Sequence, residues 1–208
     1  MESNWAAEHL QTIRTLMERS AIYRRALAPI MTFNGVVGLV VGSAGWLLRI
    51  DSMRGFALFW ACGAAVALTG SFILVRRQAL KDSEPFWSPP TRRIAHALSA
   101  PFFIGMVMGA VASLFGSGED TSHEVVLILG WVWLYGCAIH SAGSFMPRGI
   151  RLFAWLFIAS GCGLLAGMVQ LIEVIKLSPH LLMAGIFGGL HLAYGIYLYF
   201  TEKGGNET

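Results

Sequence analysis

Apolar residues run through this chain in six long, nearly unbroken blocks, and charged residues gather between the blocks. Each block is close to the ~20 residues that a helix needs to cross the hydrocarbon of a bilayer. Unbroken apolar runs are typical of spanning helices, whereas the strands of a membrane barrel alternate in polarity. The pattern predicts an all-α membrane protein, a bundle of six transmembrane helices at about Leu27–Leu48, Gly55–Val75, Ile94–Phe115, Val125–Phe145, Leu152–Ile175 and Pro179–Phe200.

Ahead of the first block, apolar residues return every three or four positions and form one stripe along a helix. The stripe consists of Ala6, Leu10, Ile13, Met17 and Ala21. We therefore predict three parts: a cytoplasmic amphipathic helix over residues 1–26, the bundle over residues 27–203 and a disordered tail over residues 204–208. The amphipathic helix is suited to packing on the inner leaflet or under the bundle, or to binding a cytosolic partner.

The composition agrees with the pattern. Of 208 residues, 55% are hydrophobic and 13% are charged, against about 25% charged residues in a soluble domain. This excludes a soluble globular protein, a disordered chain and a disulfide-rich secreted scaffold. All three cysteines fall inside blocks, so we expect no structural disulfide, and no cleavable signal peptide is visible.

Lysine and arginine are distributed unevenly between the two sets of loops. Twelve of the fifteen lie in the N-terminal segment, the second and fourth loops and the tail, and three lie in the other loops. The positive-inside rule therefore predicts that both termini are cytoplasmic.

Pairs of glycines four residues apart mark four of the blocks, and this spacing lets helices approach closely. The pairs are Gly38 and Gly42, Gly105 and Gly109, Gly163 and Gly167, and Gly185 and Gly189. They indicate a compact bundle and leave open whether the protein also forms a homo-oligomer.

A few polar side chains interrupt the apolar blocks, and such residues are candidate functional groups because burying them in lipid is costly. Counted from the nearest cytoplasmic charge, four of them come at similar depths, which predicts a polar layer of Asn34, His140, His191 and Tyr194. Tyr135 joins these candidates, and Cys137 lies one turn from His140.

Three interpretations of this layer remain open. The side chains can simply make interhelical hydrogen bonds. They can line a pathway for a small solute or ion. Alternatively, Cys137, His140 and His191 can ligate a metal or haem, although the sequence favours no cofactor.

Two further groups of candidates lie near the ends of the blocks. Gln170 and Glu173 would sit at the outer mouth of a pathway, although Glu173 can equally pair with Lys176. In the second loop, Trp87, Arg92 and Arg93 are suited to contact lipid headgroups or a cytosolic partner, or they merely anchor the loop.

Familiar catalytic and channel motifs are absent from the sequence: it has no Walker loop, potassium filter, zinc-protease motif or nucleophile elbow, and no nucleic-acid-binding module. These absences weigh against an enzyme without settling the question, and we expect no binding of nucleic acid.

The run Ala7–Arg14, the run Tyr23–Arg25 and the loop Glu84–Arg93 resemble a family of bacterial six-helix membrane proteins with no established activity. The resemblance covers most of the chain and implies a bacterial inner membrane. It supplies no site residue.

Three functions follow as hypotheses. The first is a channel or transporter for a small solute or ion, with a pathway lined by the polar layer. The second is a membrane sensor or scaffold that binds a lipid or apolar ligand and a cytosolic partner. The third is a haem- or metal-containing redox protein.

Overall fold

The computed structural model describes residues 26–83, 85–116, 121–146, 149–168 and 178–204. The predicted amphipathic helix and most of the predicted tail lie outside these residues. Within them the chain is entirely helical, and six helices are long and apolar enough to cross a membrane.

Each helix covers most of one predicted block, although α2, α3 and α4 begin or end up to six residues away from the predicted bounds. They are the first span Ala26–Leu47, α2 (Met53–Lys81), α3 (Pro89–Phe115), α4 (Thr121–Ala142), α5 (Gly149–Met168), and a sixth span made of α7 (Pro179–Met183), η1 (Ala184–Gly189) and α8 (Leu190–Gly204). The π-helical turn η1 was not predicted, because nothing in an apolar run distinguishes i→i+5 from i→i+4 bonding.

Local sequence explains several helix ends. Ser52 caps α2, since its hydroxyl accepts a hydrogen bond of 3.2 Å from the Gly55 amide. Pro89 and Pro179 are the first residues of α3 and α7, where proline is tolerated because that amide needs no helical partner. His123 and Glu124 lie in the first turns of α4, ahead of the predicted start of this span at Val125. Glu124 is buried.

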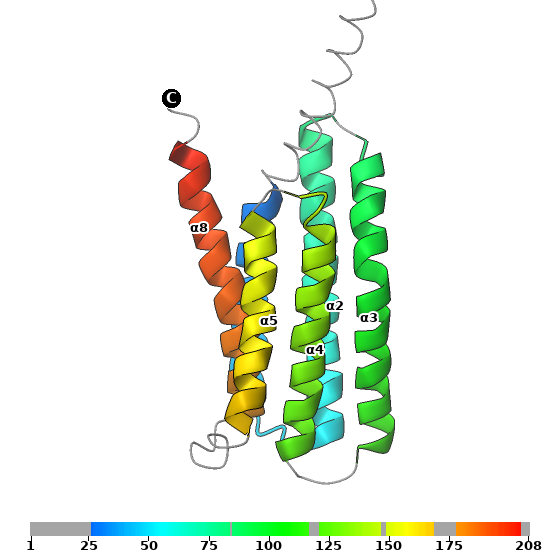
Figure 1. Cartoon of the computed structure of the whole chain (residues 1–208), viewed down its shortest axis with the longest axis vertical. Coiled ribbons are helices and arrows are strands. Elements are labelled where there is room, and N and C mark those ends of the chain that lie inside the picture. The colour runs from blue at the N-terminus through cyan, green and yellow to red at the C-terminus, as the bar shows by residue number, and fades with distance from the viewer. Residues whose placement is uncertain (1–25, 84, 117–120, 147–148, 169–177, 205–208) are drawn as a thin grey trace, which may run out of the picture.

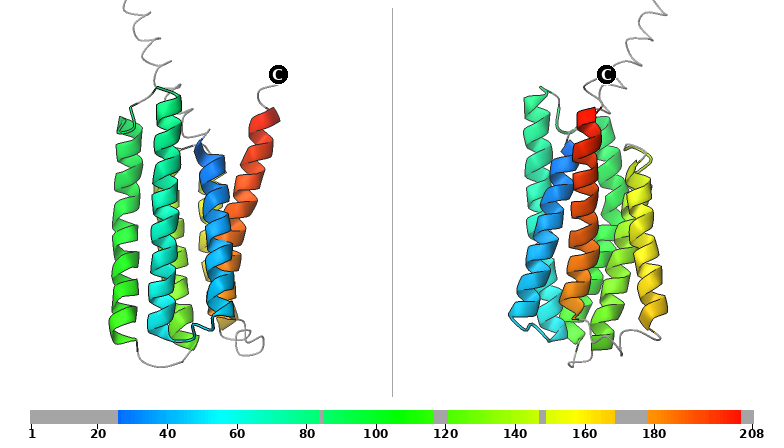
Figure 2. Two further views of the ribbon diagram at one scale, coloured as in Figure 1. Left: turned by 180° about the vertical axis from the view of Figure 1, so that it is seen from behind. Right: turned by 90° about the vertical axis from the view of Figure 1, so that its left-hand side faces the viewer.

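The bundle has two layers. Figure 1 shows α3, α4 and α5 side by side, and Figure 2 shows α2, the first span and α8 behind them. The first span begins and α8 ends at the same end of the bundle, which we call the proximal end. The opposite end, which carries residues 48–52 and the starts of α4 and α7, is the distal end.

The first and sixth spans are in backbone contact. A Cβ on Gly38 would lie 2.8 Å from the Gly188 N and Cα atoms, and a Cβ on Gly35 would meet the Leu192 backbone. Gly42 faces Ala184 in the same way. Small residues permit this approach, which sets how the sixth span is rotated toward the rest of the bundle.

The other predicted glycine pairs behave differently from one another. Gly105 and Gly109 on α3 make room for the indole of Trp131 on α4, whose Nε1 donates to the Gly105 carbonyl at 2.9 Å. Gly163 and Gly185, by contrast, face open space. Helical spacing alone did not identify which pairs would be in contact.

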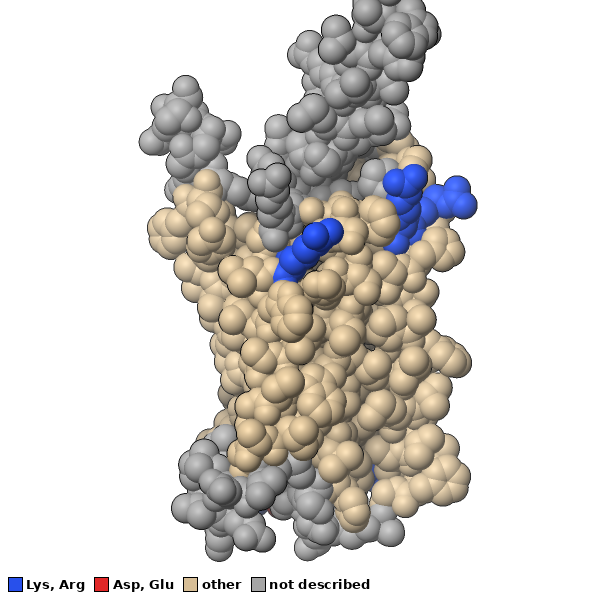
Figure 3. Space-filling view, in the orientation of Figure 1, with Lys and Arg blue, Asp and Glu red and all other residues tan. Residues whose placement is uncertain are grey.

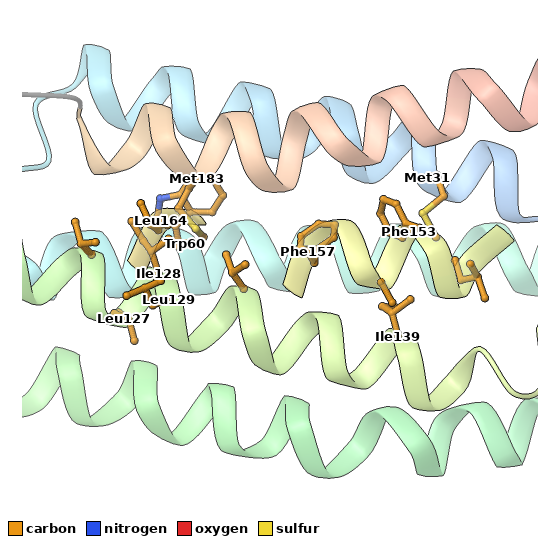
Figure 4. Close-up of a cluster of buried hydrophobic side chains, with 14 of the residues drawn as sticks. Met31, Trp60, Leu127, Ile128, Leu129, Ile139, Phe153, Phe157, Leu164 and Met183 are labelled. Carbon is orange, nitrogen blue, oxygen red and sulfur yellow. The ribbon is translucent and has the colours of Figure 1, made fainter. Parts of the chain in front are cut away.

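The core lies between the layers, and α4 is the most buried span while α3 is the most exposed. Figure 4 shows Phe153 and Phe157 projecting from α5 into this core. Large apolar side chains are also exposed on the outside, among them Val40, Val66, Phe103, Met106, Leu152 and Ile196. The face in Figure 3 is largely uncharged at mid-height, with its visible lysines and arginines mostly near the proximal end. This exterior is compatible with contact to a lipid bilayer.

Candidate functional site

His191, in the first turn of α8, is a polar side chain buried in the bundle and only 3% exposed. Its Nδ1 lies 2.6 Å from the Phe187 carbonyl oxygen, and its Nε2 lies 2.6 Å from the Tyr135 hydroxyl. A carbonyl only accepts, so Nδ1 carries the proton and donates to Phe187. In the neutral ring, Nε2 then accepts from the hydroxyl of Tyr135, which joins the sixth span to α4.

Aromatic rings surround this pair. The centroids of Phe153 and Phe157 lie 5.1 and 5.4 Å from that of His191, both edge-on, and Phe187 stacks at 6.4 Å. The Tyr135 ring packs 4.8 Å from Phe157. A hydrogen bond in such surroundings is not exposed to competing water, and breaking it leaves a buried polar group without a partner.

The π-helical turn lies directly beside this site. Phe187, whose carbonyl accepts the hydrogen bond from His191 Nδ1, belongs to η1, and Gly188 of the same turn packs on Gly38 of the first span. Phe187, which bonds His191, and Gly188, which packs on the first span, are therefore neighbours in one irregular turn. Such turns are frequent at functional positions of helices.

Tyr194 lies one turn further along α8. Its ring stacks on Phe153 at 4.6 Å, and its hydroxyl is buried without a hydrogen-bond partner. A Cβ on Gly149, the first residue of α5, would approach that hydroxyl to 2.9 Å. The structure therefore packs two of the predicted residues, His191 and Tyr194, against Phe153, and Tyr135 joins them through its hydrogen bond to His191.

The remaining residues of the predicted layer point elsewhere. The Asn34 carbonyl oxygen accepts a hydrogen bond of 3.1 Å from the Ser71 hydroxyl, between the first span and α2. His140 is half-buried, and its ring packs edge-on against Trp155 at 5.7 Å, while Trp155 itself is 55% exposed. Similar depth placed these residues in one layer, but their rotation about each helix axis directs them to different neighbours.

The candidate metal ligands are not gathered in one place. Cys137 is exposed, and no group of three or more His, Cys, Asp or Glu side chains suited to a metal ion occurs in the part of the chain that the structure describes. Gln170 and Glu173 lie outside the described residues.

The second-loop candidates lie at the proximal end. Trp87 is 59% exposed and stacks on Phe86, and Arg92 is exposed. The Arg93 guanidinium lies over the Phe145 ring, 5.8 Å from its centroid. An exposed aromatic ring beside exposed guanidinium groups is suited to the headgroup layer of a bilayer.

A second histidine site lies at the distal end, at a residue that was not among the predicted site residues. His180, 2% exposed near the start of α7, accepts a hydrogen bond of 3.1 Å at Nδ1 from the indole N–H of Trp60 on α2. Its Nε2 lies 3.0 Å from the Ile50 carbonyl. His180 precedes His191 by eleven residues, about three helical turns, and this spacing was the signal available in the sequence.

Comparisons with family models, with curated proteins and with solved structures each find no match for this chain. The resemblance to a bacterial six-helix family therefore stays a prediction.

Proposed function

We propose that this integral membrane protein moves protons, or a small hydrogen-bonding solute, through its bundle, and that Tyr135 and His191 form the centre of the pathway. The observation that carries the proposal is the Tyr135–His191 hydrogen bond, enclosed by aromatic rings at the meeting point of α4, α5 and the sixth span. Polar pairs at such positions mark ion and proton routes in membrane proteins.

The chemistry of the pair supports a proton as the transported species. A hydroxyl both donates and accepts, so Tyr135 can rotate its proton away when His191 becomes charged and still keep the hydrogen bond. Both ring nitrogens already have partners within 2.6 Å, which leaves little capacity to ligate a larger ion.

Other residues extend the proposed pathway toward the two ends. Tyr194 is the next group on the proximal side, because its buried hydroxyl has a free hydrogen-bonding capacity. At the distal mouth, Gln170 and Glu173 are further proposed lining residues, whereas we leave Asn34 out because it bonds Ser71 between the first span and α2. We place His140 and Cys137 outside the pathway, because His140 packs on the exposed Trp155 and Cys137 is itself exposed.

We further propose that the proximal end is cytoplasmic and that the membrane is a bacterial inner membrane. The described lysines and arginines support this orientation, since the proximal end carries Arg76, Arg77, Lys81, Arg92, Arg93 and Arg151 while the distal end carries Arg49 and Arg54. Trp87 and Arg92 would then contact the lipid headgroups of the inner leaflet.

Proton flux into proteoliposomes tests the proposal. The purified protein is reconstituted with an internal pH dye, and a potassium diffusion potential drives protons inward. Tyr135→Phe and His191→Gln are expected to lower the flux at least about tenfold, as loss of a proton-transfer group does. His140→Ala serves as the matched control and should keep the flux. Equal flux in all variants, or none above protein-free liposomes, would contradict the proposal.

A second candidate, a membrane scaffold or sensor with a cytosolic partner, is favoured by one observation. The first and sixth spans are packed backbone to backbone, and both buried histidines already have two hydrogen-bond partners each, which suits a rigid anchor. This candidate predicts that deleting residues 1–25 abolishes function while His191→Gln does not. Measuring both variants in one cellular assay separates the two functions.

A further inference from the structure

His180 ties together three segments at the distal end of the bundle. It lies in the first turn of α7, its Nδ1 is bonded to Trp60 of α2, and its Nε2 is bonded to the Ile50 carbonyl just after the first span. These two bonds cross 120 and 130 residues of sequence, so they hold the start of the sixth span against α2 and the segment after the first span.

The partners of His180 permit only one protonation state. An indole N–H is a donor only, so Nδ1 must be unprotonated to accept from Trp60. The Ile50 carbonyl is an acceptor only, so Nε2 must carry the proton. The ring is therefore neutral, and a second proton at Nδ1 would set two donors against each other across 3.1 Å.

The residues packed around the His180 ring restrict its orientation. The Phe56 and Phe59 centroids lie 4.9 and 5.9 Å from that of His180, and the ring fits against Gly45 where a Cβ would collide with it. Within this packing, a protonated ring cannot turn to find another acceptor for Nδ1. A charge there is also without compensation from its described contacts, and a buried uncompensated charge is costly.

The elements packed around the His180 ring carry the charged or titratable residues Arg49, Asp51, Arg54, His123 and Glu124. None of the described contacts of the ring is with these five residues. Ile50, whose carbonyl bonds the ring, is half-buried between the exposed residues Arg49 and Asp51, so the His180 site lies close to the distal surface.

We propose that His180 is a proton-operated latch of the distal end. Near neutral pH the latch is closed by the Trp60 and Ile50 hydrogen bonds. When Nδ1 takes a proton from the distal phase, Trp60 loses its acceptor, the charged ring leaves its aromatic pocket, and the segment after the first span separates from α2 and the sixth span. The latch does not depend on the proposed function, but if that function is right, the latch opens the distal side of the pathway.

Hydrogen–deuterium exchange of the whole protein in detergent tests the latch at about pH 8 and about pH 5, which bracket the ordinary titration of histidine. After correction for the intrinsic pH dependence of exchange, the amides of residues 48–52 should exchange roughly tenfold faster at the lower pH, as expected for local opening. Amides in the middle of α4 should not change.

Three variants distinguish the latch from other titrating groups. His180→Gln keeps one donor and one acceptor but cannot be charged, so exchange should lose its pH dependence. Trp60→Phe removes the donor that protonation opposes, so the pH dependence should shrink at least about twofold even if His180→Gln does not fold. His123→Gln, a change at an exposed histidine of the same end, should keep the full response.

The latch is overturned if wild-type exchange at residues 48–52 is independent of pH, if His180→Gln and Trp60→Phe keep the wild-type response, or if His123→Gln removes it. Failure of the proposed function gives a different result, because proton flux would then be absent while the pH-dependent exchange persists.

Discussion

The sixth span carries two buried histidines that make opposite use of their ring nitrogens. At the distal end, His180 accepts at Nδ1 from Trp60 and donates at Nε2 to the Ile50 carbonyl. In the middle of the bundle, His191 donates at Nδ1 to the Phe187 carbonyl and accepts at Nε2 from Tyr135. Both are neutral in this arrangement, and both are almost completely buried.

The difference lies in the partner that faces the unprotonated nitrogen. Tyrosine can reverse its hydrogen bond and tryptophan cannot. Protonation of His191 can therefore leave both of its hydrogen bonds in place, whereas protonation of His180 breaks one, although both histidines lie on the sixth span. This contrast is the physical basis for assigning proton transfer to one histidine and a switch to the other.

The largest expected effect comes from breaking the helix contact that positions both histidines. Gly38→Leu places a side chain where Gly188 backbone atoms lie 2.8 Å from an ideal Cβ, so the first and sixth spans must separate. We expect a loss of about 3 kcal/mol or misassembly, as for severe overpacking. The measurement is the thermal midpoint and monodispersity in detergent.

The matched control for this prediction is Gly185→Ala, where the added methyl group meets open space. It should change stability by less than about 0.5 kcal/mol. If Gly38→Leu were equally harmless, the backbone contact would not determine how the sixth span is oriented.

The next effect separates the central site from the distal one. Tyr135→Phe leaves Nε2 of His191 without a donor inside an aromatic enclosure, which should destabilise the protein by about 1–2 kcal/mol. The distal latch should keep its pH response, because Tyr135 does not contact it. Thermal unfolding and hydrogen exchange measured on one preparation check both statements, and a lost latch response would show that the two sites are coupled.

Removing the distal partner should have a somewhat smaller effect on stability. Trp60→Phe deletes the donor to His180 but keeps an aromatic ring in the core, so we expect a loss of about 1 kcal/mol, within the range of hydrogen bonds in membrane bundles. Trp155→Phe is the control, since that indole is 55% exposed. Unfolding midpoints of the two variants give the comparison, and equal losses would mean that the Trp60–His180 bond adds nothing.

The smallest effect is expected at His140. His140 is half-buried beside the exposed Trp155, so His140→Ala should change stability by less than about 0.5 kcal/mol and leave proton flux unchanged. A large loss of flux would return His140 to the pathway and contradict the comparison between two functional histidines.

Much of the fold could be predicted from the sequence, because span positions depend on local composition. The first span was expected to end at Leu48 and ends at Leu47, and the third was expected to end at Phe115 and does. The fourth ends earlier than expected, at Ala142, since Arg151 binds the Gly143 carbonyl and the Ser144 hydroxyl in the turn that follows.

The candidate site was predicted only in part. The depth of His191 and Tyr194 follows from the helical rise of 1.5 Å per residue, which is why both were chosen. The same argument chose His140, whose ring faces Trp155, and it did not weigh His180, whose partners are 120 and 130 residues away. Depth is a local property, whereas a hydrogen-bond partner depends on which helix is adjacent.

The sequence by itself determined that the chain is helical, that it has six segments able to cross a membrane, and that its basic residues are concentrated at one end. These properties depend on the free energy of transferring each segment from water to lipid, and the residues within that segment of the sequence set this energy. Only the tertiary structure decided which glycines are in contact, where η1 interrupts the sixth span, and which nitrogen of each histidine carries the proton. Those features depend on the rotation of each helix against its neighbours, and side chains distant in the sequence fix that rotation jointly.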